Sequence, residues 1–153
     1  MMTEDKSMMV NTNRGWGDVA VDGLWPGIVG GVLMLVYLAA VGLLRGDSPA
    51  AVLAYFLPDD NLPVIAGLGV HLATSAVYGA IFSVLLGVVG RFRPRSLPYW
   101  GAGLVFGILL GLGAWLVVIP GGMLGLGAVP TRHLLVAHGL YGLGMGWVLG
   151  RDQ

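Results

Sequence analysis

The residues best suited to chemistry are two histidines inside long apolar runs, each followed by a tyrosine at helical spacing. His71 and Tyr78 share one face of a predicted helix, with Ser75 between them. His138 and Tyr141 share a face of a later predicted helix. At a rise of about 1.5 Å per residue, both histidines lie on the order of 10 Å from the outer ends of their helices. Two imidazoles at one depth can act on one ligand.

Three roles are open for this pair. Two neutral imidazoles on facing helices can ligate a haem axially, which makes haem b a candidate cofactor. They can instead bind the headgroup of a quinone, with Tyr78 and Tyr141 beside them. In the structural role, which we expect, each histidine bonds a hydroxyl or a backbone carbonyl across a helix interface. We predict no other metal or cofactor site, because His133 follows Arg132 at a helix end and is expected to be interfacial.

The apolar runs contain no Asp, Glu, Lys or Arg at depth. Proton relays, ion pathways and carriers of charged substrates need such groups, because an isolated charge is too costly in hydrocarbon to be present without use. No serine, histidine and acid form a plausible hydrolytic arrangement. We therefore expect a protein that is not an enzyme, a pump or a coupled transporter.

The composition indicates which elements position these residues. The chain has 153 residues, of which 56% are hydrophobic and 10% charged, and it contains 27 glycines and no cysteine. This is too apolar for an ordinary soluble domain, and a net charge of zero argues against a nucleic-acid partner. We predict an all-α integral membrane protein, a Gly-rich and tightly packed bundle of four transmembrane helices. The predicted spans are about 23–44, 63–90, 98–119 and 131–150.

The remaining segments are short. Residues 1–22 are predicted to form a cytoplasmic tail ahead of a single transmembrane domain over 23–153, with Pro26 in the first turn of its first span. Residues 48–57 are too short to span and are predicted to lie along the interface, with Tyr55 and Phe56 facing lipid or a neighbouring subunit.

Basic residues set the predicted orientation. Arg91, Arg93 and Arg95 lie between the second and third spans, and short loops rich in Lys and Arg stay in the cytoplasm. This arrangement puts six of the eight Lys and Arg residues on one side and predicts a multi-pass protein of the bacterial inner membrane with both termini cytoplasmic. The two halves then form helical hairpins that run in the same direction. A weak echo between residues 75–79 and 138–142 agrees with that repeat.

Small residues recur every four positions in all four spans. Lipid gives helices no hydrophobic reason to associate, so such rows matter because they let backbones approach closely. We expect them to be helix-packing surfaces, facing either each other or another protein. The rows are Gly23, Gly27 and Gly31; Gly79, Ser83 and Gly87; Gly103, Gly107 and Gly111; and Gly142, Gly146 and Gly150.

A family resemblance rests on three stretches: the second span with His71 and its Tyr78-Gly79 pair, the end of the third span from Trp115 to Pro120, and residues 138–142. Together with the double-hairpin layout, they resemble the small uncharacterised four-helix membrane proteins of bacteria of the YagU-like kind. The resemblance covers about residues 24–150. It implies the architecture and no reaction or ligand.

The function predicted from these features is that of a non-catalytic accessory or structural subunit of a larger membrane complex. We expect a respiratory or photosynthetic electron-transfer assembly, because these carry small polytopic subunits. Its partners are then the lipid bilayer and other membrane-protein subunits. One alternative is a haem- or quinone-binding redox subunit that uses His71 and His138. Another is a small oligomeric channel, against which the scarcity of polar pore residues argues.

The topology can be tested with reporters placed after Gln153, near Pro94 and near Asp59. We expect the first two to report the cytoplasm and the third the outside, because of the charge asymmetry between the two sides. A periplasmic signal from the reporter near Pro94 would contradict the orientation.

Overall fold

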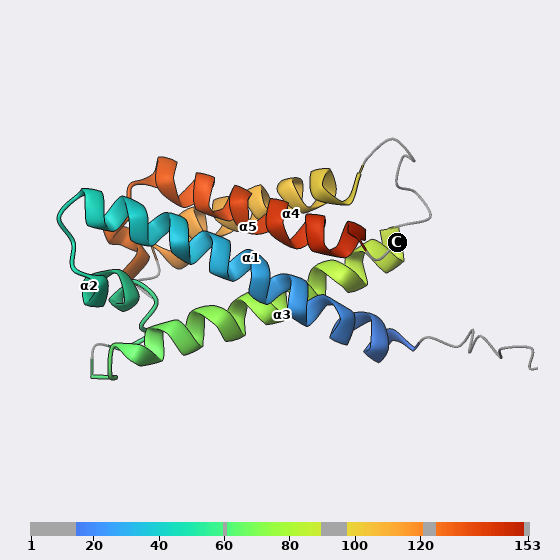
Figure 1. Ribbon diagram of the computed structural model, residues 1–153, viewed down its shortest axis with the longest axis horizontal. Helices are drawn as coiled ribbons and strands as arrows, with labels where there is room; N and C mark the ends of the chain where they lie inside the picture. The colour runs from blue at the N-terminus through green and yellow to red at the C-terminus, as the bar shows by residue number, and fades with distance from the viewer. Residues whose placement is uncertain (1–14, 60, 90–97, 121–124, 152–153) are drawn as a thin grey trace, which may run out of the picture.

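The computed structural model describes residues 15–59, 61–89, 98–120 and 125–151. These residues form helices joined by turns, and no strand occurs among them (Figure 1). In chain order the elements are α1 (Trp16–Leu44), α2 (Pro49–Ala54), α3 (Ile65–Val89), α4 (Tyr99–Gly113), the π-helical η1 (Ala114–Val118), the 3-10 helix η2 (Gly125–Ala128) and α5 (Thr131–Arg151).

Among the described residues, three stretches are long and apolar enough to cross a membrane. They are Trp16–Leu44, Ile65–Val89 and Tyr99–Val118, the last made of α4 and η1 together. This is the pattern of a membrane protein. The fourth predicted span corresponds to α5, which has 21 residues but falls outside this group. Its two arginines, two histidines and frequent glycines make it the least apolar of the long helices.

The first helix begins earlier than the sequence suggested. It starts at Trp16 rather than Gly23, so part of the predicted tail is helical. Asp18 stabilises this start, since its carboxylate accepts a hydrogen bond from the Gly15 backbone N–H at 3.0 Å. Pro26 is therefore inside the helix and buried, not in its first turn. Membrane helices tolerate such a proline when neighbouring helices pack around it.

The long helices pack in a chain of pairs. α1 packs against α3, α4 packs against α5, and α1 also packs against α5. Figure 1 shows that α1 begins and α5 ends at one end of the molecule, while α2 lies at the opposite end. Among the described helices, α3 and α4 are not a closely packed pair. They meet through side chains such as Phe82 and Phe106, whose ring centroids are 5.0 Å apart.

The contact between α1 and α3 is made by backbone atoms at glycine. A Cβ atom built on Gly79 would overlap the carbonyl oxygen of Gly23 and lie 2.6 Å from the Cα of Gly27. A Cβ on Gly27 would overlap the carbonyl oxygen of Ser75, and one on Gly31 would lie 2.6 Å from the Ser75 Cβ. Any side chain at these glycines would push the helices apart.

The contact between α4 and α5 repeats this arrangement. A Cβ on Gly142 would overlap the carbonyl oxygen of Gly103 and lie 3.1 Å from the Cα of Gly107. A Cβ on Gly107 would in turn overlap the carbonyl oxygen of His138. His138 and Gly142 thus occupy the places in the second pair that Ser75 and Gly79 occupy in the first.

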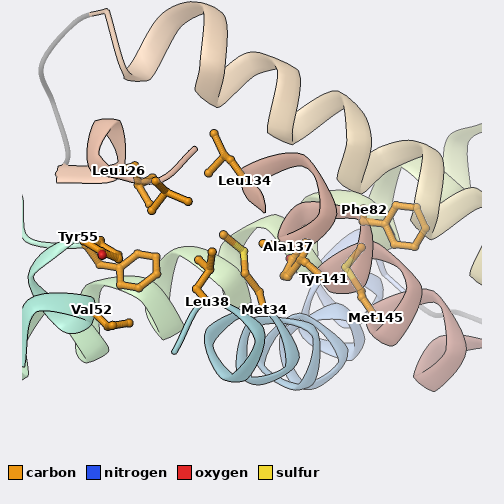
Figure 2. Close-up of a cluster of buried hydrophobic side chains, with 12 residues drawn as sticks. Met34, Leu38, Val52, Tyr55, Phe82, Leu126, Leu134, Ala137, Tyr141 and Met145 are labelled. Atoms are coloured by element: carbon orange, nitrogen blue, oxygen red, sulfur yellow. The ribbon is translucent and has the colours of Figure 1, made fainter. Parts of the chain in front are cut away.

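The buried side chains gather where α2 and η2 close one end of the molecule. Figure 2 shows Met34 and Leu38 of α1 beside Tyr141 of α5, with Tyr55 and Leu126 further along the same cluster. Larger apolar side chains face outward over much of the remaining surface, as in a protein that lipid surrounds.

The expectation that Tyr55 and Phe56 face lipid or a neighbouring subunit is wrong. Both are buried, because α2 folds back onto the bundle instead of lying apart from it. The Tyr55 hydroxyl donates to Asp47 at 2.6 Å. Burial raises the pKa of Tyr55, and the hydrogen bond to Asp47 adds to this effect, so the hydroxyl is kept protonated as a donor.

The glycine crossing predicts a contrast between two substitutions in α3. Gly79→Ala should lower the free energy of unfolding by about 1–3 kcal/mol, because its methyl group overlaps the backbone of α1. Gly69→Ala is the matched control, since an added Cβ there meets nothing within 4 Å. The measurement is reversible unfolding in detergent, followed by circular dichroism. Equal stability of the two variants would contradict the crossing.

Candidate functional site

A cavity of about 210 Å³ lies between α3 and α4, the two neighbouring helices that do not pack closely. Its walls are mostly apolar, but it gathers several polar side chains of the described spans. The lining residues that carry polar groups are His71, Thr74, Ser75, Tyr78, His138 and Tyr141.

His71 comes from the wall formed by α3 and is held by contacts on two sides. Its Nε2 lies 2.9 Å from the carbonyl oxygen of Gly31 in α1. Its ring packs on Phe56, with centroids 4.2 Å apart. Gly31 carries no side chain, so the imidazole can reach the backbone of the neighbouring helix.

His138 comes from α5 and bonds within its own helix, so the expectation of a bond across a helix interface holds for His71 and is wrong for His138. Its Nδ1 lies 2.9 Å from the carbonyl oxygen of Leu134, one turn earlier. Gly111 of α4 lies against its side chain, because a Cβ built there would be 3.0 Å from the His138 Cβ. His138 lines the cavity from α5.

The two tyrosines differ in their surroundings. Tyr141 is 2% exposed and donates its hydroxyl to the backbone carbonyl of Ser75 at 2.8 Å, which links α5 to α3. Tyr78 is 37% exposed and lines the cavity from α3. Leu109, on the opposite wall, is 61% exposed. The cavity therefore opens to the outside of the bundle between these two side chains.

The end of the α4 wall is irregular. The α-helix gives way to π-helical turns at Ala114, and both Ala114 and Val118 line the cavity. Such turns are rare and occur frequently beside functional sites. Gly113 also lines the cavity, and an added Cβ there meets nothing within 4 Å.

The predicted chemical residues come together. His71, Tyr78, His138 and Tyr141 all line the same cavity, on α3 and α5. His133 is not merely interfacial, because its Nδ1 bonds the Tyr37 hydroxyl of α1 at 2.8 Å.

The predicted glycine rows mostly face each other inside the chain. Four members of the rows pack against side chains rather than against backbone: Gly31 against Ser75, Gly87 against Trp16, Gly111 against His138 and Gly150 against Tyr99. Gly146 packs on the Tyr99 backbone, and Ser83 packs beside Gly23. The topology residues Arg91, Arg93 and Arg95 lie outside the described residues.

Sequence reasoning missed a second set of close contacts. Gly30 lies against the backbone of Tyr141, and Gly144 lies against Leu33, so both belong to the packing of α1 on α5. Gly67 lies against the Leu53 carbonyl and seats α2 on α3. The signal for the first contact was the Gly30-Gly31 pair, because adjacent glycines in a helix open two different faces.

The site offers neutral hydrogen-bonding groups in an apolar enclosure and no charge. Within the described part of the chain, no group of three or more His, Cys, Asp or Glu is placed to hold a metal ion. The arrangement suits recognition of an uncharged molecule by shape and a few hydrogen bonds.

No protein-family model, curated protein or solved structure matches this chain. The resemblance to YagU-like proteins therefore stays a prediction from the residues that carry it.

The tyrosines predict a second contrast. Tyr141→Phe should lower the free energy of unfolding by about 1 kcal/mol, because it removes the hydrogen bond between α5 and the Ser75 carbonyl. Tyr78→Phe should leave stability nearly unchanged, since this side chain is 37% exposed at the cavity wall. Thermal and denaturant unfolding of both variants checks this, and an equal loss in Tyr78→Phe would show that the cavity wall is packed differently.

Proposed function

We propose that this chain is a four-helix integral membrane protein that binds the ring of a lipid-soluble molecule of the quinone type, without catalysing a reaction. The observation that carries the proposal is the convergence of neutral polar side chains on one apolar cavity between α3 and α4. Polar groups inside a membrane protein are costly and commonly mark a functional site. The opening beside Tyr78 and Leu109 lets a molecule enter from the bilayer.

The volume of the cavity supports a single ring. An apolar cavity of about 150 Å³ holds one benzene. The 210 Å³ found here therefore suits one six-membered ring with small substituents, with any tail left in the lipid. Haem is a macrocycle of four pyrrole rings and needs much more room. His71 would also have to release its Nε2 from Gly31 to ligate iron through that atom.

The proposed topology has all four long helices crossing the bacterial inner membrane as two hairpins of the same direction, with both termini cytoplasmic. α1 begins and α5 ends at the same end of the molecule, which supports this topology (Figure 1). The matching glycine contacts in the two helix pairs support it as well. α5 is the least apolar of the four; it packs against both α1 and α4, and its two arginines, Arg132 and Arg151, are exposed near its two ends.

An accessory role in a respiratory or photosynthetic electron-transfer assembly stays a prediction, and it is compatible with ligand binding. The glycine rows give this accessory role less support than expected, because they pack within the chain and are not free to hold a partner. The large apolar side chains on the outer surface are what another subunit would meet. Native mass spectrometry of gently extracted complexes tests this role.

The binding proposal is tested in lipid nanodiscs with duroquinone and its reduced form, duroquinol, as probes. A ligand that binds the folded state raises the unfolding temperature, by the equivalent of about 2.7 kcal/mol at 100 times its Kd. We expect wild-type protein to be stabilised by at least one probe. Gly113→Phe should lose the effect, because its ring fills the cavity from a position with open space.

Gly69→Phe is the control, since that side chain is added to open space away from the cavity. The proposal is wrong if neither probe stabilises the wild type, or if Gly113→Phe responds as the wild type does.

A further inference from the structure

The hydrogen bonds of the two histidines identify which ring nitrogen carries the proton. A backbone carbonyl can only accept, so the nitrogen bonded to it must be the donor. His71 therefore carries its proton on Nε2, which faces the Gly31 carbonyl. His138 carries its proton on Nδ1, which faces the Leu134 carbonyl. The two rings are opposite tautomers.

In neutral imidazole the second nitrogen has no proton and is an acceptor. Both rings are kept neutral because no carboxylate lies among the residues that line the cavity and charge in hydrocarbon is costly. The free acceptors are thus Nδ1 of His71 and Nε2 of His138. In the described part of the chain no buried side-chain nitrogen or oxygen lacks a partner. These two nitrogens are therefore not fully buried atoms without a partner, and both histidines line the cavity.

We infer that the cavity selects the reduced, hydroxyl-bearing form of its ligand, a quinol, over the oxidised quinone. This inference rests on the proposed function and names the ligand class of the same site. A quinol has two O–H donors at opposite ends of its ring, and the site presents two acceptor nitrogens from α3 and α5. A quinone has only carbonyl acceptors. No proton would lie between these oxygens and the histidine nitrogens, so no hydrogen bond would form between them.

The hydroxyls in the cavity do not reverse this preference. Thr74 and Tyr78 line it and can donate to a quinone carbonyl. A hydroxyl can also donate to a quinol oxygen, although more weakly than to a carbonyl, because that oxygen keeps lone pairs. The hydroxyl groups therefore serve both forms, and the histidine nitrogens serve the quinol alone. The difference of about one to two hydrogen bonds corresponds to roughly tenfold tighter binding of the quinol.

The experiment measures Kd in nanodiscs, under anaerobic conditions, for three probes with the same tetramethylated ring. These are duroquinol, duroquinone and the dimethyl ether of duroquinol, which keeps both oxygens but has no O–H donor. We expect duroquinol to bind about tenfold more tightly than either of the others. His138→Phe keeps an aromatic ring and removes one of the two acceptors, so it should reduce the preference for duroquinol clearly, and the remainder is what His71 supplies. A cooperative unfolding transition measured for this variant confirms that it is folded.

The outcomes separate the two proposals. Equal binding of duroquinol and duroquinone, or tighter binding of duroquinone, overturns the preference and leaves ligand binding in place. A duroquinol preference of the same size in His138→Phe as in the wild type overturns the role of His138. Binding of none of the three probes overturns the proposed function itself. Nitrogen-15 NMR gives an independent check, because it separates protonated from unprotonated ring nitrogens and should find His71 and His138 in opposite tautomers.

Discussion

The structure depends on contact between helix backbones at glycine. At the crossing of α1 and α3 the carbonyl oxygen of Gly23 lies where a side chain of Gly79 would be, and Gly103 and Gly142 repeat the contact between α4 and α5. Apolar side chains gain nothing by leaving lipid for another apolar surface, so close packing must supply the attraction. Only the absence of side chains at these crossings permits that packing.

The cavity follows from how the two helix pairs join. α1 packs closely on α5 through Gly30 and Gly144, whereas α3 and α4 are not joined in this way among the described residues. The gap between them is filled in part by Phe82 and Phe106. Further along, the same gap stays open as the cavity. Two similar pairs that meet tightly on one side and loosely on the other thus create an enclosure, and Phe56 and Leu126 from the connecting segments help to line it.

Two polar side chains form hydrogen bonds at the close helix crossings. His71 reaches the Gly31 carbonyl because that residue has no side chain, and Tyr141 reaches the Ser75 carbonyl from another helix. These bonds satisfy one atom of each residue and stabilise the bundle, as the structural role predicted from sequence requires. They also determine which histidine nitrogen is left to a ligand. The structural and the ligand-binding roles are therefore two consequences of one arrangement.

Much of the architecture was predictable, since long apolar runs and four-residue spacing depend on local sequence. The bounds of α3 and α5 and the use of Gly27 or Gly107 in packing follow from such patterns. The start of α1 was not predicted, because Asp18 and Asp22 made residues 16–22 look like part of a polar tail, whereas Asp18 stabilises the helix start. The burial of Tyr55 was missed because it depends on α2 folding back onto the bundle.

The site was predictable only in part. The positions of His71 and His138 within their predicted spans placed them at one depth. The spacing of residues in a sequence does not predict which helices of a bundle lie apart. The cavity depends on the α1 and α5 contact and on the π-helical turns from Ala114, both of which are set by tertiary packing. The choice of tautomer likewise needed the positions of the Gly31 and Leu134 carbonyls.

The most direct test of this account is solid-state NMR of the protein in lipid bilayers, with carbon-13 at the glycine Cα positions. The account predicts cross-peaks between Gly27 and Gly79 and between Gly107 and Gly142, because the backbones touch at these residues. Both should be present without any ligand. If neither cross-peak is found, or if these glycines correlate only with lipid, the backbone crossings do not hold the helices together and the cavity between α3 and α4 loses its basis.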